Sequence, residues 1–387
     1  MKLRWLGGLR GLRGLARLKL EEALLPPVVA LLIALLVGDL LILSFGQSPA
    51  AVYRQLLEGT WGNAYGLGQV LYKTTTLAFT GLSVALALRA GLFNIGAESQ
   101  LAAGGFAAAL VGLALPAGLP SLLVLPLYVL AAGGAGAIVG GIPGVLKAKF
   151  GAHEVITTIM LNFIVLALLN YLITTRYKVH DTLHTAEIKS GVLPRLADFY
   201  SPFHGSAANA VLVLALVIVA ATWWFLFRTR AGFELRAVGL QPPAAEYAGV
   251  NVGGVWWHAM ALAGAIAGIG GLNYVLGYKH YYEEGFSAGA GFLGIAVALV
   301  GRSHPVGIVI AAVLFATLSQ GGLAVNALVP KQMVDVLQAV VIISMATAVP
   351  EVRRVLLAVR REAGSGKREA STAPPNRTPL PFSRSTP

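Results

Sequence analysis

The chain has 387 residues, of which 56% are apolar and only 12% are charged, whereas roughly 25% of the residues of an average soluble domain are charged. This composition excludes a soluble globular protein and predicts a membrane protein with many spans. The net charge of +12 does not indicate a nucleic-acid partner, because the basic residues cluster at the ends of apolar runs. The absence of cysteine excludes disulfides and thiolate metal sites.

The apolar runs approach the roughly 20 residues that a membrane-spanning helix needs, which favours helices over the shorter strands of a barrel. The predicted fold class is therefore an all-α, polytopic bundle of about ten transmembrane helices within residues 23–350. Residues 1–22 predict a basic amphipathic helix that lies on membrane lipid. The first span is predicted over 26–46, because the apolar run continues past Asp39 without the cleavage site of a signal peptide.

After a polar connection predicted over 47–65, the second span ends at Arg89 and leads to an unusual stretch over residues 91–100. This stretch places Asn94, Glu98 and Gln100 between two apolar runs, where unpaired polar groups are costly. Its glycines would let a helix break, which is tolerated at membrane depth beside protein or a water-filled cavity. The stretch is interpreted as the lining of a pathway, or alternatively as a cytoplasmic turn capped by Asn94 and Glu98.

The fourth predicted span carries three glycines at intervals of four, which predicts close contact with another helix. They are Gly136, Gly140 and Gly144. The fifth span begins with Glu154 and carries Asn162, so its polar face is expected to meet water or other helices. The loop over 176–207 contains histidines too scattered to argue for a metal site. The third span is predicted to follow the 94–100 stretch and to end at about residue 115. The other spans are predicted over roughly 68–89, 121–147, 153–175, 208–227, 255–277, 287–301, 305–323 and 333–349.

The sixth and seventh spans are joined by a polar segment in which two prolines precede helix-forming residues. This pattern predicts a short surface helix over about 233–249, with a simple loop as the alternative. With both termini in the cytoplasm, the inner segments hold 21 Lys and Arg residues and the outer segments hold eight. That asymmetry supports cytoplasmic termini. The tail over 351–387 is basic and rich in Pro, Ser and Thr, which predicts disorder.

Two nucleotide-like motifs lack the context that their chemistry requires. Residues 289–294 match GxGxxG inside an apolar span with no preceding strand, and Gly364-Ser365-Gly366-Lys367 lacks the other residues of a phosphate-binding loop. No nucleophile or acid–base constellation stands out either. The chain is therefore not expected to be an enzyme or to bind a cofactor of its own.

Four stretches together resemble permease subunits of bacterial ABC importers, in the branched-chain amino acid permease superfamily. The resemblance is strongest to the nucleoside branch, which is close to the simple-sugar permeases. It runs in matching order from about residue 48 to 350 and departs at Ser99, where the family often has Gly. The four stretches cover residues 91–98, residues 153–162, residues 236–249 with Arg236-Ala237-Val238-Gly239 and Ala244-Ala245-Glu246-Tyr247-Ala248-Gly249, and residues 294–299.

The resemblance implies a subunit of a multi-pass importer in the bacterial inner membrane that forms the translocation pathway for nucleosides. ATP would be used by a cytoplasmic ATPase with two cassettes. The other implied partners are a second, shorter permease and an extracytoplasmic solute-binding lipoprotein, with no nucleic acid. The ATPase would push on the 233–249 helix, where the expected coupling residues are Arg236, Gly239, Ala244, Ala245, Tyr247 and Gly249.

Polar residues in the predicted spans are the candidates for the pathway lining, with hydrogen bonds to hydroxyls or base edges as their expected role. They are Asn94, Glu98, Gln100, Glu154, Asn162 and Asn273. Each can instead be a structural tie between helices, since buried polar groups usually have partners. Two other functions stay open. One is a permease for ribose, other simple sugars or branched-chain amino acids, and the other is an ion-coupled transporter in which Asp39, Glu98 and Glu154 titrate.

Overall fold

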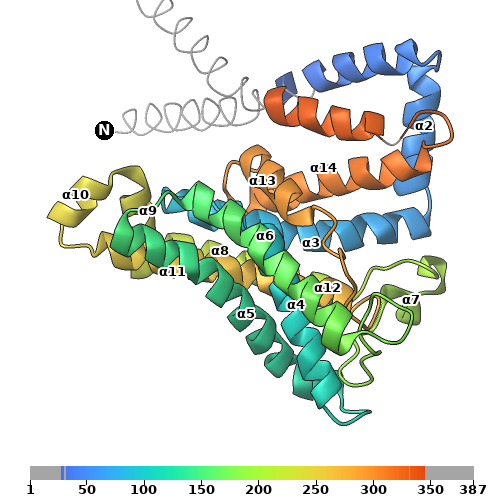
Figure 1. The fold of residues 1–387 in the computed structure, drawn as a ribbon. Coiled ribbons are helices and arrows are strands. Elements are labelled where there is room, and N and C mark those ends of the chain that lie inside the picture. The colour runs from blue at the N-terminus through green and yellow to red at the C-terminus, as the bar shows by residue number, and fades with distance from the viewer. Residues whose placement is uncertain (1–27, 30–31, 331, 345–387) are drawn as a thin grey trace, which may run out of the picture. The chain divides into compact units, whose positions relative to one another are not determined.

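The computed structural model describes residues 28–29, 32–330 and 332–344. The predicted leader over 1–22, the tail over 351–387 and the last part of the predicted tenth span lie outside this part. The description below concerns the unit Ala34–Ile342. Its regular secondary structure is helical throughout the described residues, with three isolated β-bridges and no strand (Figure 1).

Seven described helices are long and apolar enough to cross a membrane, or eight if one bent pair is a single span. They include α3 (Ala64–Arg89), α4 (Ala97–Ala114), α5 (Ser121–Phe150), α8 (Val211–Arg228) and α14 (Pro305–Ala324). The other two are α6 (Glu154–Leu172), which continues into the π-helical turn η1 (Ile173–Tyr177), and α11 (Val252–Gly270), which continues into α12 (Leu272–Val275). The helical, many-span fold is thus confirmed, and the count of ten stays a prediction.

Two of the predicted spans correspond to shorter apolar helices, α13 (Ala290–Val300) and Gln332–Ser344. The bent pair consists of Leu32–Ser44 and α2 (Pro49–Thr60), which meet at 110°. Most of the polar segment predicted over 47–65 is helical, because Pro49 starts a helix whose apolar side is buried at Val52.

Helix α3 lies at the centre of the unit, and its residues from Thr74 to Ala87 are buried apart from Thr76. It packs against α11, α13 and α14. Its start is fixed by Asn63, whose Oδ1 accepts a hydrogen bond of 2.7 Å from the Gly66 amide. By contrast, the window of α5 that fits a span is only 28% buried, so much of this helix can face lipid.

The predicted contact through the glycines of α5 is present, and its partner is α11. The carbonyl oxygen and backbone of Gly264 lie so close to Gly136 and Gly140 that a side chain at either position would overlap them. Without a hydrophobic driving force between helices in lipid, such backbone-to-backbone packing is a main source of association. It makes α5 and α11 the most extensive helix pair among the described residues.

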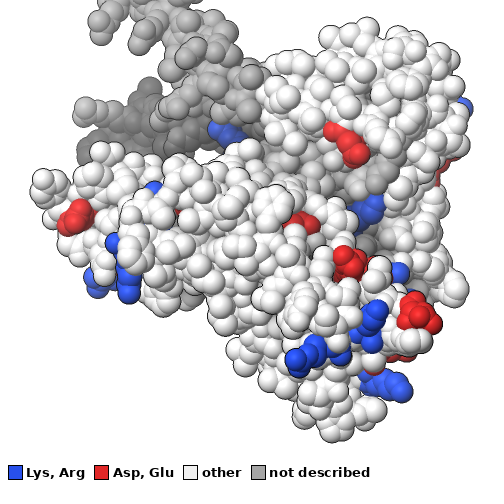
Figure 2. All heavy atoms as spheres, in the orientation of Figure 1, with Lys and Arg blue, Asp and Glu red and all other residues white. Residues whose placement is uncertain are grey.

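Charged side chains gather near α9 (Arg230–Leu240) and α10 (Pro242–Tyr247) and near the loop that holds α7 (Leu196–Phe199) and η2 (Ser201–Phe203). The surface between these two regions is largely uncharged in the view of Figure 2. This distribution is typical of a protein whose middle contacts lipid.

Candidate translocation pathway and coupling surface

The chain between α3 and α4 forms a buried helix break that is closed by side-chain amides. Gly91 has a φ of +75°, a conformation that glycine adopts without strain. Asn94 and Gln100 pair through two reciprocal hydrogen bonds of 2.8 and 3.1 Å between their carboxamides. Asn94 also donates to Ser83 Oγ and accepts from the Gly96 amide. The break is therefore stabilised inside the bundle, but Asn94 does not cap α4, which begins after Gly96 without a side-chain cap.

Asn162 reaches this break from the neighbouring helix α6. Its Oδ1 accepts a hydrogen bond of 3.1 Å from the Ser99 amide, and its Nδ2 donates to the Ile95 carbonyl at 2.9 Å. The first amides of a helix have no partner within the helix. In α4, Asn162 pairs one of them, that of Ser99, although the two residues are 63 positions apart in the sequence. This side chain therefore links α6 to the break.

Glu98 caps a helix other than its own, which differs from the turn interpretation. Its Oε1 accepts hydrogen bonds from Ser287 Oγ at 2.6 Å and the Gly289 amide at 2.9 Å, and its Oε2 accepts one from the Gly291 amide at 2.6 Å. A carboxylate at the amino end of α13 is favourable to the helix dipole. Just before that helix, Ala288 has a φ of +43°, which costs energy for a residue with a side chain. Glu98 therefore fixes a strained loop in place.

Glu154 and Asn273 are also buried, and each is bound to another helix. Glu154 accepts a hydrogen bond of 2.9 Å from Lys147 of α5. Asn273 donates to the Tyr72 carbonyl at 2.9 Å and to Thr76 Oγ1 at 2.8 Å. All six predicted lining residues are thus buried among helices, and their contact with a substrate stays a prediction.

A cavity of about 230 Å³ lies next to the partners of Glu98 and Asn273. Its walls include Tyr72 and Thr76, which Asn273 holds, and Ser287 and Gly289, which Glu98 holds. Two of the predicted polar residues therefore lie one layer behind its walls. The aromatic lining of this cavity was not predicted, although a high density of Tyr and Phe over residues 274–286 is visible in the sequence. We call it the aromatic pocket; its remaining lining residues are Lys73, Leu77, Leu101, Gly270, Tyr274, Phe286, Ala288, Ala290, Leu293 and Ser319.

The segment predicted as a surface helix over 233–249 forms two helices, α9 and α10, with different roles. In α9, Gly239 lies against the Arg89 carbonyl and the backbone of Gly91, so that no side chain fits between α9 and the helix break. In α10, Ala245 is buried, whereas Ala244 and Tyr247 face outward and Tyr247 is 95% exposed. Gly249 follows α10 and is exposed. Among the expected coupling residues, Gly239 thus touches the break, whereas Ala244, Tyr247 and Gly249 are exposed.

Two arginines and one ring join α9 to the rest of the bundle. The guanidinium groups of Arg89 and Arg236 lie 5.8 and 5.2 Å from the centre of the Phe227 ring, within the range of cation–π attraction. Arg89 also donates a hydrogen bond of 2.9 Å to the Ser303 carbonyl, in the turn between α13 and α14. The next residue, His304, has its ring 5.5 Å from Phe227. This cluster connects α3, α8, α9 and the start of α14.

The pKa of His304 lies below its ordinary value of 6.5, because the ring is partly buried and the positive charge of Arg89 is close. Below about pH 6.5 the unfolded chain takes up a proton at this residue that the folded protein resists, so the free energy of unfolding falls as pH decreases. We therefore expect the thermal stability of the purified protein to fall more steeply between about pH 7.5 and 5.5 than that of His304→Gln. Equal slopes for the wild type and His304→Gln would contradict this assignment.

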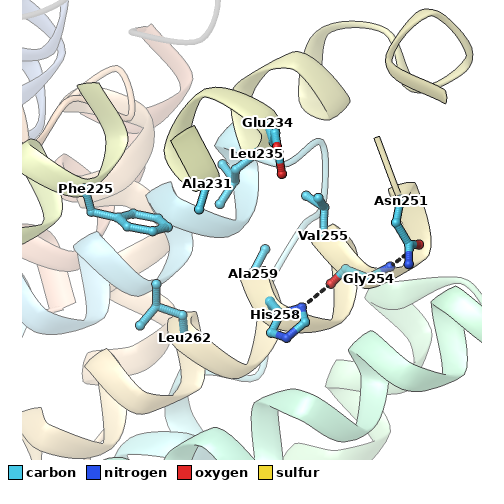
Figure 3. Close-up of a pocket in the computed structure, with 10 residues that line it drawn as sticks. All are labelled: Phe225, Ala231, Glu234, Leu235, Asn251, Gly254, Val255, His258, Ala259 and Leu262. Atoms are coloured by element: carbon cyan, nitrogen blue, oxygen red, sulfur yellow. Dashed lines mark hydrogen bonds between the residues drawn. The ribbon is translucent and has the colours of Figure 1, made fainter. Parts of the chain in front are cut away.

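An open groove of about 560 Å³ separates part of α9 from α11. Figure 3 shows Ala231, Glu234 and Leu235 on one side and Val255, His258 and Ala259 on the other. The two hydrogen bonds marked in Figure 3 join His258 to the Gly254 carbonyl and the Gly254 amide to Asn251, and neither of them crosses the groove. Helix α9 is therefore held firmly at Gly239 but has open space along its side.

A family model for the permease component of the branched-chain amino acid transport system matches residues 66–346. The chain belongs to this family. The match covers α3 to α14 and thus includes the helix break, the aromatic pocket and the α9–α10 segment. The protein is accordingly a multi-pass permease of the inner membrane and not an enzyme.

Three relatives match the permease over most of their length. A guanosine ABC transporter permease protein of Bacillus subtilis is 38% identical over 84% of this chain and 93% of its own. A nucleoside ABC transporter permease protein of Lactococcus lactis is 35% identical over 83% and 90%. A glucose ABC transporter permease protein of Haloferax volcanii is also 35% identical, over 83% and 87%. No solved structure was found to match the permease.

Proposed function

We propose that this permease forms the translocation pathway of an ATP-driven importer of nucleosides. The observation that carries the proposal is the similarity, at 38% and 35% identity over nearly the full length, to a guanosine and a nucleoside permease. The arrangement of α9 and α10 supports it, because a chain with an exposed cytoplasmic helix and no nucleotide motif of its own needs an external ATPase. The proposed partners are an ATPase with two cassettes, a second, shorter permease and an extracytoplasmic solute-binding lipoprotein.

The proposed mechanism transmits force from α10 to the helix break. The ATPase binds the outward face of α10 around Tyr247, and closure of its two cassettes on ATP shifts α9 along the open groove. Because Gly239 lies against Arg89 and Gly91, α9 cannot move without displacing the start of the break. The displacement reaches α6 through Asn162 and α4 through the Asn94–Gln100 pair. Two bundle packings of similar energy are sufficient for alternating access of this kind.

A sugar permease is the second candidate, and the glucose permease at 35% identity favours it. The ion-coupled alternative has less support in the geometry. It needs carboxylates that share a route, but Glu98 is bound at the start of α13, Glu154 is bound to Lys147 and Asp39 lies beside the hydroxyl of Tyr53. The polar residues named above are therefore proposed to position the pathway.

Removal of the permease gene should abolish uptake of labelled guanosine and adenosine in a cell that has no other nucleoside importer. Restoring the wild-type chain should restore uptake, whereas Tyr247→Asp should not. A tyrosine at the centre of a protein interface can contribute about 2 kcal/mol or more to binding. The purified Tyr247→Asp permease should therefore no longer bind the ATPase. Tyr200→Asp places the same charge on an exposed loop residue and should retain the ATPase.

The two readouts separate the parts of the proposal. Unchanged nucleoside uptake without the permease would contradict the substrate, whatever happens to the ATPase. Retention of the ATPase by Tyr247→Asp at the wild-type level would contradict the role of α10 and leave the substrate standing. Tyr247 suits this test better than Ala245, because Ala245 is buried within the permease and its replacement would disturb the fold.

A further inference from the structure

We propose that the aromatic pocket is a binding site for the base of the transported nucleoside, a ligand assignment that rests on the proposed function. Three rings line the pocket, Tyr72 from α3 and Tyr274 and Phe286 from either side of the turn after α12. The centres of the Tyr274 and Phe286 rings are 4.9 Å apart and the rings are tilted by 44°. Any nucleobase can stack on an aromatic side chain, because every base has a π-face. The stacking does not depend on which hydrogen-bond donors and acceptors the base carries.

The pocket offers more ring surface than hydrogen-bonding capacity, which favours a base over a sugar alone. Four of its hydroxyl groups already have a partner: Ser287 donates to Glu98, Thr76 accepts from Asn273, Ser319 accepts from Lys73 at 3.2 Å, and Tyr274 donates to Glu283. A sugar offers many hydroxyls, and each one that enters without a partner loses its bonds to water. A flat heteroaromatic ring carries fewer groups that need a hydrogen-bond partner in the pocket. The pocket volume of about 230 Å³ is below the roughly 300–1,000 Å³ typical of sites for drug-sized ligands, so it suits one small solute.

The three rings belong to a continuous chain of seven aromatic side chains. Successive ring centres are 4.9 to 6.1 Å apart, within the range of favourable aromatic contacts. The chain ends at Tyr177, which is 38% exposed at the end of η1. Its members in order are Tyr72, Tyr278, Tyr274, Phe286, Tyr282, Phe106 and Tyr177.

The position of the pocket fits an entrance to the pathway. On the proposed orientation, Lys73 is near the outer end of α3, and the turn over residues 276–289 faces the outside. A solute released by the extracytoplasmic receptor would meet these rings before it reached the helix break. Glu98 holds Ser287 and Gly289 in the pocket wall and also belongs to the first turn of α4, next to the break. Movement of the break would therefore reshape the pocket and release the base.

The test uses the complete importer in cells without other nucleoside uptake. Tyr72→Leu and Phe286→Leu remove a ring and keep an apolar side chain, and each should reduce the rate of labelled adenosine uptake by about fivefold or more, since stacking of one base supports a change of that size. Tyr72→Phe keeps the ring and should transport faster than Tyr72→Leu by a similar factor. The matched control is Phe163→Leu, because Phe163 is 69% exposed on α6 and does not line the pocket.

Photolabelling of the wild-type importer gives a second readout that does not depend on the folding of variants. Irradiation with 8-azidoadenosine should label peptides that contain Tyr72, Tyr274 or Phe286, and excess adenosine but not ribose should prevent it. Labelling confined to other helices, or adenosine uptake by both leucine variants at the control rate, would overturn the assignment of the pocket. A wild-type importer that carries ribose or glucose and no nucleoside would instead overturn the proposed function.

Discussion

Replacement of Gly140 by leucine is expected to prevent the permease from accumulating in the membrane as a folded protein. A Cβ atom at this position would lie 2.5 Å from the Met260 carbonyl oxygen and 2.9 Å from the Gly264 Cα, and both contacts are with backbone. Overpacking of a well-packed contact typically costs about 1–3 kcal/mol, and here two backbones must separate along the whole α5–α11 contact. We expect a loss at or above about 3 kcal/mol, because close packing is the main attraction between these helices in lipid.

Gly134 supplies the matched control on the same helix. It is exposed, and a Cβ atom there would have no neighbour within 4 Å. Gly134→Leu should therefore accumulate like the wild type and elute from size-exclusion chromatography in the same volume after detergent extraction, whereas Gly140→Leu should be degraded or aggregate. Equal yields of folded protein from the two variants would show that the close approach of α5 and α11 is not needed for the fold.

The second large effect is expected at Glu98. Glu98→Ala leaves Ser287, Gly289 and Gly291 without their acceptor, and each buried donor left unpaired costs about 1–3 kcal/mol. Glu98→Gln keeps one acceptor oxygen, but its side-chain NH2 group would then face at least one of the groups that now donate to the carboxylate. We expect both variants to lower the melting temperature of the purified permease, with alanine the more severe, and both to reduce nucleoside uptake strongly, because the pocket wall and the start of α13 lose their anchor.

Glu58→Gln is the control for this comparison, because Glu58 is an exposed carboxylate on α2. Surface changes of this kind usually alter stability by less than about 0.5 kcal/mol. If Glu98→Gln melted at the same temperature as Glu58→Gln and transported at the same rate, the bond between α4 and α13 would have no role in stability or transport.

Some features of the bundle could be predicted because they depend on local patterns. The seven long apolar helices and the glycine ridge of α5 follow from residue type and spacing. The helix α2 was missed, although Pro49 at its start and the apolar residues Val52 and Leu56 are local signals. The length of α13 could not be read from its apolar run alone, because Ala288 and Gly289, which have positive φ angles immediately before it, are held by contacts from elsewhere in the chain.

The partners of the predicted polar residues could not be predicted, because they are distant in sequence. Glu98 binds residues about 190 positions away, and Asn273 binds Tyr72 and Thr76 about 200 positions away. Polarity inside an apolar span indicates that a partner exists but not which one. The same limit applies to the aromatic pocket: the density of rings near Tyr274 was visible, but their meeting with Tyr72 depends on how α3 packs beside α12.

The most direct test of the account is transport into proteoliposomes of defined composition. Vesicles that contain this permease with its ATPase, second permease and solute-binding lipoprotein should accumulate labelled guanosine only when ATP is supplied on the ATPase side. Vesicles that contain the purified permease alone should neither accumulate guanosine nor hydrolyse ATP. Accumulation of guanosine by the permease alone, driven by an ion gradient or by ATP, would contradict the claim that a separate ATPase drives this bundle from its cytoplasmic side.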